Sequence, residues 1–172
     1  MSPRELLRLL AAEMTAAGVP DADVDAGLLL SHVTGTLPLR MNSWSQVSPE
    51  AESAFRALCE RRKTRTPLQY LTGVQSFLGR DFFVDERVLI PRPETELLAE
   101  RAIEALRRSE GKYALDLCCG SGCLAVSLAL GVPGAQVHAA DLSPDALDVT
   151  GINANRLGAS IIRHQGDLFS AL

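Results

Sequence analysis

The sequence has no excess of positive charge. Its 172 residues include 17 Lys and Arg against 21 Asp and Glu, which gives a formal net charge of −4 at pH 7. Non-specific nucleic-acid binding depends on many cationic contacts to phosphates, so stable binding of nucleic acid is not expected. Arg61, Arg62, Lys63 and Arg65 do form a cluster. At the end of a predicted helix such cations favour a solvated terminus that complements the helix dipole.

The chain also lacks an uninterrupted apolar segment that would suggest a membrane span. Residues 117–140 contain no Asp, Glu, Lys or Arg, but glycines, Pro133 and Gln136 interrupt them. This pattern indicates a glycine loop with flanking strands rather than a membrane helix. Glu5 and Glu13 lie among the first leucines, and no signal-peptide pattern is present, so export is not expected. We expect a cytoplasmic, monomeric protein.

Cysteines are few and do not form a ligand pattern. Cys118, Cys119 and Cys123 lie close together without a C-x-x-C pair, and Cys59 stands apart. Structural zinc sites and disulfide frameworks need spacings that this sequence does not offer. We therefore expect reduced thiols and no bound metal.

Residues 1–65 are predicted to form a helical domain. Leu6, Leu10 and Met14 recur at helical spacing, and Ser48 before a proline is a good start for a later helix. No set of nucleophile, base and metal ligands appears in this segment. Its expected role is packing or recognition of a partner.

Residues 66–90 are predicted to form a linker that contains a β-hairpin. Two runs rich in Phe and Val, 74–78 and 81–84, flank a turn with glycine. The prolines that follow favour an extended segment, because each keeps the residue before it out of the helical region. A helix is expected from Pro93 onward.

Residues 91–172 alternate between strand and helix patterns, which predicts an α/β domain with a parallel sheet and right-handed crossovers. The expected strands are 113–117, 136–140 and 160–163. The expected helices within this alternation are 121–130 and 143–157.

The main functional signal is the sequence DLCCGSG at residues 116–122, where a strand is predicted to end and a helix to begin. Gly120 and Gly122 let the backbone turn sharply and approach a ligand closely. The same glycines also match a dinucleotide-binding fingerprint. The glycines alone therefore do not identify the cofactor.

Three acids lie at the ends of the three predicted strands and favour S-adenosylmethionine over NAD. Asp141 lies 19 residues after Gly122, where a carboxylate can accept hydrogen bonds from both hydroxyls of a ribose. Asp116 would oppose a pyrophosphate but suits a ligand with an ammonium and a sulfonium. Asp167 could accept a hydrogen bond from an adenine amino group. The alternative is that these acids only cap or terminate their elements.

Seven stretches of the sequence together resemble the HemK/PrmC family of release-factor glutamine N5-methyltransferases, and the resemblance runs over the whole chain. LIPRPETE is the most specific stretch, because similar enzymes that act on a ribosomal-protein glutamine continue differently after Pro-Arg. The stretches are RTPLQYLTG at 65–73, FLG at 77–79, VLIPRPETE at 88–96, DLCCGSG at 116–122, DLS at 141–143, NA at 153–154 and GDLF at 166–169.

The resemblance implies an N-terminal helical domain that helps to recognise the release factor, a β-hairpin linker, and the first half of a class I, Rossmann-like methyltransferase sheet. It implies S-adenosyl-L-methionine as the cofactor. The implied cofactor-binding residues are Asp116, Cys118, Cys119, Gly120, Ser121, Gly122, Asp141, Asp167 and Leu168. The family commonly has Gly-Thr in place of Cys118-Cys119, and the loss of glycine limits backbone freedom there.

Arg92 and Glu94 are further candidates for lining the site. Glu94 and Glu96 suit either a general base or, at a helix start, acids that complement the helix dipole. Both interpretations stay open.

The implied activity is N5-methylation of a glutamine side chain in a peptide chain release factor. The family's Asn-Pro-Pro-Tyr motif, which grips the target amide, should follow Phe169, yet the sequence stops at Leu172. The catalytic residues are therefore unassigned, and we expect an inactive part of a longer protein. Two alternatives stay open: a nucleic-acid adenine N6-methyltransferase, and a non-catalytic fragment that binds the cofactor or the release factor.

Overall fold

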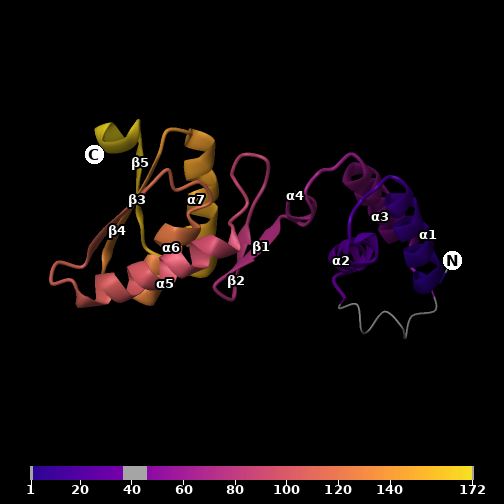
Figure 1. Cartoon of the computed structure of the whole chain (residues 1–172), viewed down its shortest axis with the longest axis horizontal. Helices are drawn as coiled ribbons and strands as arrows, with labels where there is room; N and C mark the ends of the chain where they lie inside the picture. The colour runs from indigo at the N-terminus through magenta and orange to yellow at the C-terminus, as the bar shows by residue number, and fades with distance from the viewer. Residues whose placement is uncertain (1, 37–45, 172) are drawn as a thin grey trace. The chain divides into compact units, whose positions relative to one another are not determined.

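The structure, a computed structural model, describes residues 2–36 and 46–171 (Figure 1). The chain divides into two compact units, residues 1–72 and residues 73–172. This division falls inside the segment 66–90 that the sequence predicts as a linker. In the described part of the chain, no helix combines the length and apolar character needed to cross a membrane.

The first unit consists of helices that share one apolar core. Their bounds are α1 (Pro3–Ala16), α2 (Ala22–Thr34), α3 (Pro49–Lys63) and α4 (Leu68–Thr72). Ser48 starts α3 as predicted, since its Oγ accepts a hydrogen bond from the Ala51 N–H at 3.2 Å. The short α4 was not predicted, because its 5 residues are too few to show a helical period. The core includes Leu6, Leu10, Met14, Leu29, Leu30, Phe55, Cys59 and Leu71.

A buried ion pair ties α2 to α3. Arg62 Nε donates to Asp25 Oδ2 at 2.7 Å, and the two side chains are only 14% and 10% exposed. Arg62 Nη1 also donates to the Thr66 carbonyl at 3.3 Å. Lys63 forms ion pairs with acids of α1 and α3. The cationic cluster was predicted to be a solvated helix terminus. This prediction is wrong for Arg62, because its side chain is largely buried and pairs with a carboxylate of another helix.

The second unit begins with the predicted β-hairpin, which the structure confirms as antiparallel strands β1 (Val74–Phe77) and β2 (Arg80–Phe83). The two turn residues both have positive φ, 48° and 70°, a geometry that matches the right-handed twist of the strands. Phe77 and Phe82 meet edge to face, 5.8 Å apart, and pack with apolar residues of three later helices. The hairpin is thus part of the core of this unit.

The rest of the second unit is built on a parallel sheet with strand order β3-β4-β5, which confirms the predicted α/β class (Figure 1). Register partners Asp141 and Gln165 lie at the carboxyl ends of β4 and β5, one residue beyond the pair Leu117 and Ala140. The elements are α5 (Pro93–Arg108), β3 (Tyr113–Leu117), α6 (Cys123–Gly131), β4 (Gln136–Asp141), α7 (Pro144–Leu157), β5 (Ile162–Gln165) and the 3-10 helix η2 (Leu168–Ala171).

Several boundaries differ by one or two residues from the predicted ones, and the largest shifts are in α6 and β5. The helix α6 begins at residue 123 rather than 121, because residues 121 and 122 belong to the loop before it. The strand β5 begins at residue 162 rather than 160. The start of α6 lies at the same edge of the sheet as the carboxyl ends of the strands, where open α/β folds bind ligands.

Replacing Asp25 with alanine is expected to lower the free energy of unfolding of the helical unit by about 3 kcal/mol, because the buried charge of Arg62 would lose its anionic partner. Glu52→Ala is the matched control, since it removes a more exposed ion pair with Arg56 in the same unit and should cost at most about 1 kcal/mol. Urea unfolding followed by circular dichroism measures both losses. Similar losses for the two variants would contradict the buried role of Asp25.

Candidate cofactor-binding site

The candidate site is built around the loop of residues 118–122, which joins β3 to α6. Cys118, Gly120 and Gly122 all have positive φ in this loop, at 60°, 54° and 74°. A residue with a Cβ is strained in this region, by roughly 1 to 3 kcal/mol. Cys118 therefore occupies a backbone position that suits glycine, which is the residue that the family resemblance leads one to expect there.

The loop lies directly against α7 at Gly122. A Cβ on Gly122 would be 2.7 Å from Cγ2 of Thr150, which is too close for any side chain. Thr150 is fully buried, and its hydroxyl donates a hydrogen bond to the Gly120 carbonyl at 2.9 Å. A Cβ on Gly120 would meet no atom within 4 Å. The contact with α7 thus fixes where the loop lies.

Asp116 is a buried acid in β3, next to the loop. The residue is only 7% exposed. Its Oδ2 accepts a hydrogen bond at 3.0 Å from the N–H of Ala125, in the first turn of α6. Burial raises the pKa of Asp116 to about 6, the bond from Ala125 opposes this rise, and the nearby charge of Asp141 adds to it. A cationic ligand group would stabilise the ionised form of this carboxyl.

Asp141 joins two backbone segments at the end of β4. Its Oδ2 accepts a hydrogen bond from the Gly120 N–H at 2.9 Å, and its Oδ1 accepts one from the Ser143 N–H at 3.0 Å. Each carboxylate oxygen has a second lone pair, so both can still accept a hydrogen bond from a ligand hydroxyl. Asp141 therefore holds the loop and keeps acceptor capacity at the same time.

One cavity of about 140 Å³ borders this carboxylate. It brings together four of the predicted cofactor-binding residues, Cys118, Asp141, Asp167 and Leu168, from three strand ends. The side chains of Asp167 and Leu168 are exposed. The full lining is Leu117, Cys118, Ala140, Asp141, Leu142, Gly166, Asp167 and Leu168.

A second cavity of about 170 Å³ shares Cys118 with the first. Among the described residues that line it, Arg92 supplies a cation and Asp116 an acid, so the cavity offers one group of each sign. The full lining is Leu89, Ile90, Pro91, Arg92, Thr95, Asp116, Cys118, Cys119, Gly120, Ser121, Cys123 and Leu124. The segment before α5 and the glycine loop thus form one recess.

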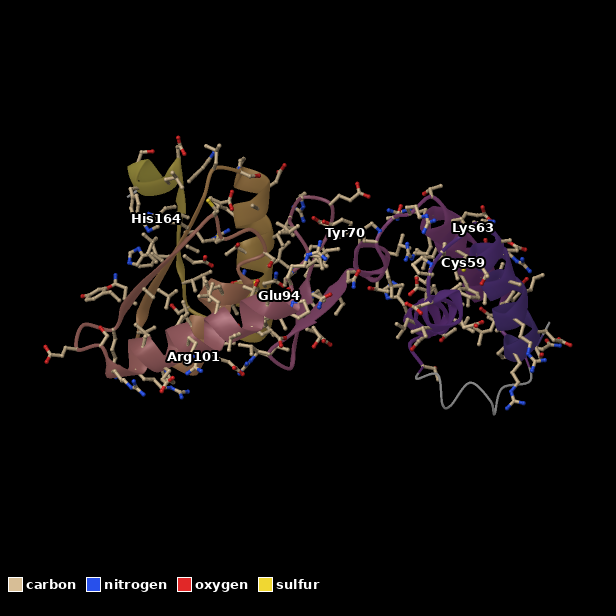
Figure 2. The ribbon with its side chains drawn as sticks, viewed as in Figure 1. Cys59, Lys63, Tyr70, Glu94, Arg101 and His164 are labelled. Atoms are coloured by element: carbon tan, nitrogen blue, oxygen red, sulfur yellow. The ribbon has the colours of Figure 1, made fainter. Side chains whose placement is uncertain are left out.

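The two acids at the start of α5 have different surroundings. Glu96 Oε1 accepts a hydrogen bond from the Leu78 N–H at 2.8 Å, so this carboxylate anchors the turn of the hairpin. Glu94 is exposed at the start of α5 (Figure 2) and does not line either of the two cavities. The hairpin contact gives Glu96 a structural role that neither sequence-based interpretation included.

Two larger cavities, of about 290 and 320 Å³, lie elsewhere in the second unit. The first borders Tyr113 and His138, and His138 stacks on His164 of β5. The second borders Gln136, the first residue of β4. Neither lies at the carboxyl ends of the strands, so we assign the site to the two cavities at the loop.

The thiols and acids near the loop do not form a metal site. In the described part of the chain, no three His, Cys, Asp or Glu side chains are grouped as metal ligands. Burial raises the pKa of Cys119 and of Cys123 to about 11, which keeps both thiols protonated at neutral pH. Cys118 is exposed.

Sequence reasoning did not assign a role to two residues of α7 that contact the loop. Thr150 bonds the Gly120 carbonyl, and Asn153 Nδ2 donates to the Ser121 carbonyl at 2.9 Å. Asn153 belongs to the NA stretch that resembles the family, but nothing in its local sequence shows which backbone group it contacts. Only the packing of α7 against the loop reveals these bonds.

Two family models match the chain, the PrmC N-terminal domain over residues 5–73 and the methyltransferase small domain over residues 94–172. Curated relatives match it too. A release factor glutamine methyltransferase of Chlorobaculum tepidum is 45% identical over 91% of this chain. Those of Deinococcus radiodurans and Geobacter sulfurreducens are each 41% identical, over 100% and 98% of it. The chain belongs to the PrmC family.

Family membership confirms the resemblance that the sequence motifs indicate. The chain spans 55%, 63% and 60% of the length of these three PrmC relatives. Among solved structures, coclaurine N-methyltransferase aligns over 95% of this chain and 48% of its own, at 17% identity and a TM-score of 0.42. A likeness this weak carries no functional argument.

Replacing Asp116 with asparagine is expected to change how stability depends on pH. The pKa of Asp116 is raised from 3.8 to about 6 on folding, so the folded chain retains its proton longer and stability falls as the pH rises from about 4 to about 6. About two pK units correspond to roughly 3 kcal/mol, and Asp116→Asn should lack this decline. Urea unfolding of both proteins between pH 4 and 7 measures it. Parallel profiles would contradict a raised pKa.

The two loop glycines allow a matched test of the contact with α7. Alanine at Gly120 or Gly122 incurs the same kind of backbone strain, because both have positive φ, but only Gly122→Ala also overlaps Thr150. Gly122→Ala should therefore lose about 1 to 3 kcal/mol more stability than Gly120→Ala. Thermal unfolding compares them, and equal losses would show that the loop does not lie against α7.

Proposed function

We propose that this chain binds S-adenosyl-L-methionine around the loop 118–122, and that the PrmC protein it belongs to methylates a release-factor glutamine at N5. The names of the curated relatives support the substrate. The observation that carries the proposal is that Asp141 and Asp116 each line one of two cavities that share Cys118 of the glycine loop.

Asp141 is the proposed ribose ligand. Its two oxygens already accept hydrogen bonds from the loop and from the start of α7, so the carboxylate is held in place before any ligand binds. The remaining lone pairs suit two vicinal hydroxyls. Preorganisation of this kind favours affinity, since little rotamer freedom is left to lose.

Asp116 and Arg92 are the proposed ligands for the amino-acid end of the cofactor. The cavity that they line presents one anion and one cation, which match an ammonium and a carboxylate on the same ligand. A pyrophosphate would instead lie close to the acids Asp116 and Asp141, with unfavourable charge repulsion. This charge pattern supports S-adenosylmethionine over a dinucleotide.

Asp167 and Leu168 are the proposed contacts for the adenine. They line the cavity that also contains Asp141, so a nucleoside held there by its ribose would bring its base toward them. The carboxylate of Asp167 can accept from an exocyclic amino group, and Leu168 offers an apolar contact to a ring face.

The transfer step depends on how the target amide is held. When bound, the cofactor supplies an electrophilic methyl group on a sulfonium sulfur. A glutamine amide is a weak nucleophile, so holding its nitrogen in line with that methyl is the main task of the protein. The sequence has no Asn-Pro-Pro-Tyr motif for this task.

We propose that residues 1–65 contribute recognition of the release factor, with 66–90 as the linker and 91–172 as the cofactor-binding domain.

Calorimetry with S-adenosylhomocysteine and with NAD tests the cofactor assignment. The chain should bind S-adenosylhomocysteine and not NAD. Asp141→Asn should weaken the binding at least about tenfold, because a ribose acceptor is lost, which corresponds to about 1.4 kcal/mol. Asp148→Asn, at an exposed acid of α7, is the matched control and should bind like the wild type.

Binding of NAD, or no effect of Asp141→Asn, would contradict this assignment.

A pull-down with a purified release factor and a labelled-methyl assay on protein-free DNA test the partner. If the chain transfers the labelled methyl group to protein-free DNA, this result would favour an adenine methyltransferase instead. The cytoplasmic location and the monomeric state stay predictions.

A further inference from the structure

The side-chain amide of Asn153 joins two segments that are far apart in the sequence. Asn153 is fully buried on α7. Its Oδ1 accepts a hydrogen bond from the Phe83 N–H at 2.7 Å, and its Nδ2 donates to the carbonyls of Phe83 and Ser121, both at 2.9 Å. A single planar group therefore holds the end of the hairpin and the glycine loop together.

On the hairpin side, the amide completes the edge of β2. The backbone N–H and C=O of Phe83 both bond to Asn153, so they are paired away from the neighbouring strand β1. A side-chain amide carries the same donor and acceptor as a peptide, and here it takes the place of one more strand residue. Without it, two polar backbone groups of the hairpin would lose their partners beside a packed core, at a cost in stability.

On the loop side, α7 holds two successive carbonyls. Thr150 bonds the Gly120 carbonyl, and Asn153 bonds the Ser121 carbonyl. All peptide bonds in the described structure are trans, so a peptide whose C=O points to α7 directs its N–H away from α7. The hydrogen bonds of Thr150 given above join it to the loop, whereas those of Asn153 join it to both the loop and the hairpin.

The hairpin has a second anchor that does not involve the loop. Glu96 Oε1 accepts a hydrogen bond from the Leu78 N–H in the turn of the hairpin, at 2.8 Å. The hairpin is thus held at its turn by α5 and at its end by α7. Of these two contacts, only the one through Asn153 reaches the cofactor loop.

We propose that Asn153 is a positioning residue that couples the hairpin to the cofactor loop. A ligand that orders the loop then also tightens the hairpin, and a loosened hairpin weakens ligand binding by the same factor, because coupling between two sites is reciprocal. In the sequence, the hairpin lies between the regions matched by the PrmC N-terminal domain and the methyltransferase domain. The proposal rests on the proposed cofactor site for its ligand.

Hydrogen exchange of the chain with and without saturating S-adenosylhomocysteine tests the coupling. The reporter is the Val84 N–H, which bonds to the Gly73 carbonyl and has no contact with Asn153 in the hydrogen bonds above. In the wild type, the ligand should slow this exchange at least about fivefold, the lower end of common coupling factors. Calorimetry of the same samples gives the affinity.

Variants separate coupling from simple support of the loop. Asn153→Asp keeps the shape but removes both N–H donors, and Asn153→Ala is the second variant should the buried charge prevent folding. Either should weaken binding about tenfold, and saturating ligand should no longer slow Val84 exchange. Thr150→Val should also weaken binding, but saturating ligand should still slow Val84 exchange. Thr150→Ser, which keeps the hydroxyl, should bind S-adenosylhomocysteine with the affinity of the wild type.

Glu96→Ala provides the reciprocal test, because it loosens the hairpin and leaves Asn153 intact. It should weaken binding of S-adenosylhomocysteine severalfold. Two results would overturn the coupling and leave the cofactor assignment standing. In one, saturating ligand does not slow Val84 exchange in the wild type. In the other, ligand still slows Val84 exchange in a folded Asn153 variant. A wild-type chain that does not bind S-adenosylhomocysteine would instead overturn the cofactor assignment, and the coupling with it.

Discussion

Helix α7 leaves no room for a side chain at Gly122, and the geometry of the candidate site follows from this close approach. The loop can lie on the helix only because Thr150 meets bare backbone there. In that position the Gly120 N–H reaches Asp141 and the Gly120 carbonyl reaches Thr150. The left-handed backbone is costly at Cys118 but not at the two glycines, and these bonds hold the segment in one shape.

Asp116 is held in the site at some cost to the fold. Burial of Asp116 disfavours its ionised form, which is why its pKa is raised to about 6. At neutral pH the carboxyl is still largely ionised, so the folded chain keeps an anion in a poorly solvated place. Perturbed groups of this kind are common at functional sites, where a ligand of opposite charge compensates them. Arg92 in the same cavity makes the recess suited to a zwitterion rather than to a simple cation.

Local patterns in the sequence were sufficient for much of the fold. The hairpin, the parallel alternation and the cap at Ser48 depend on residues close together in the chain, and the structure confirms them. The contacts that were missed are all long-range. Arg62 finds its acid on another helix, Glu96 finds the hairpin turn, and Asn153 finds both the hairpin and the loop. No period or spacing reports which backbone group a buried polar side chain will meet.

A crystal structure of the chain soaked with S-adenosylhomocysteine tests the central claim most directly. We expect ligand density along the loop 118–122, with the ribose hydroxyls within hydrogen-bond distance of Asp141 and the amino group next to Asp116. Ligand density elsewhere on the sheet, or a ribose with no contact to Asp141, would contradict it.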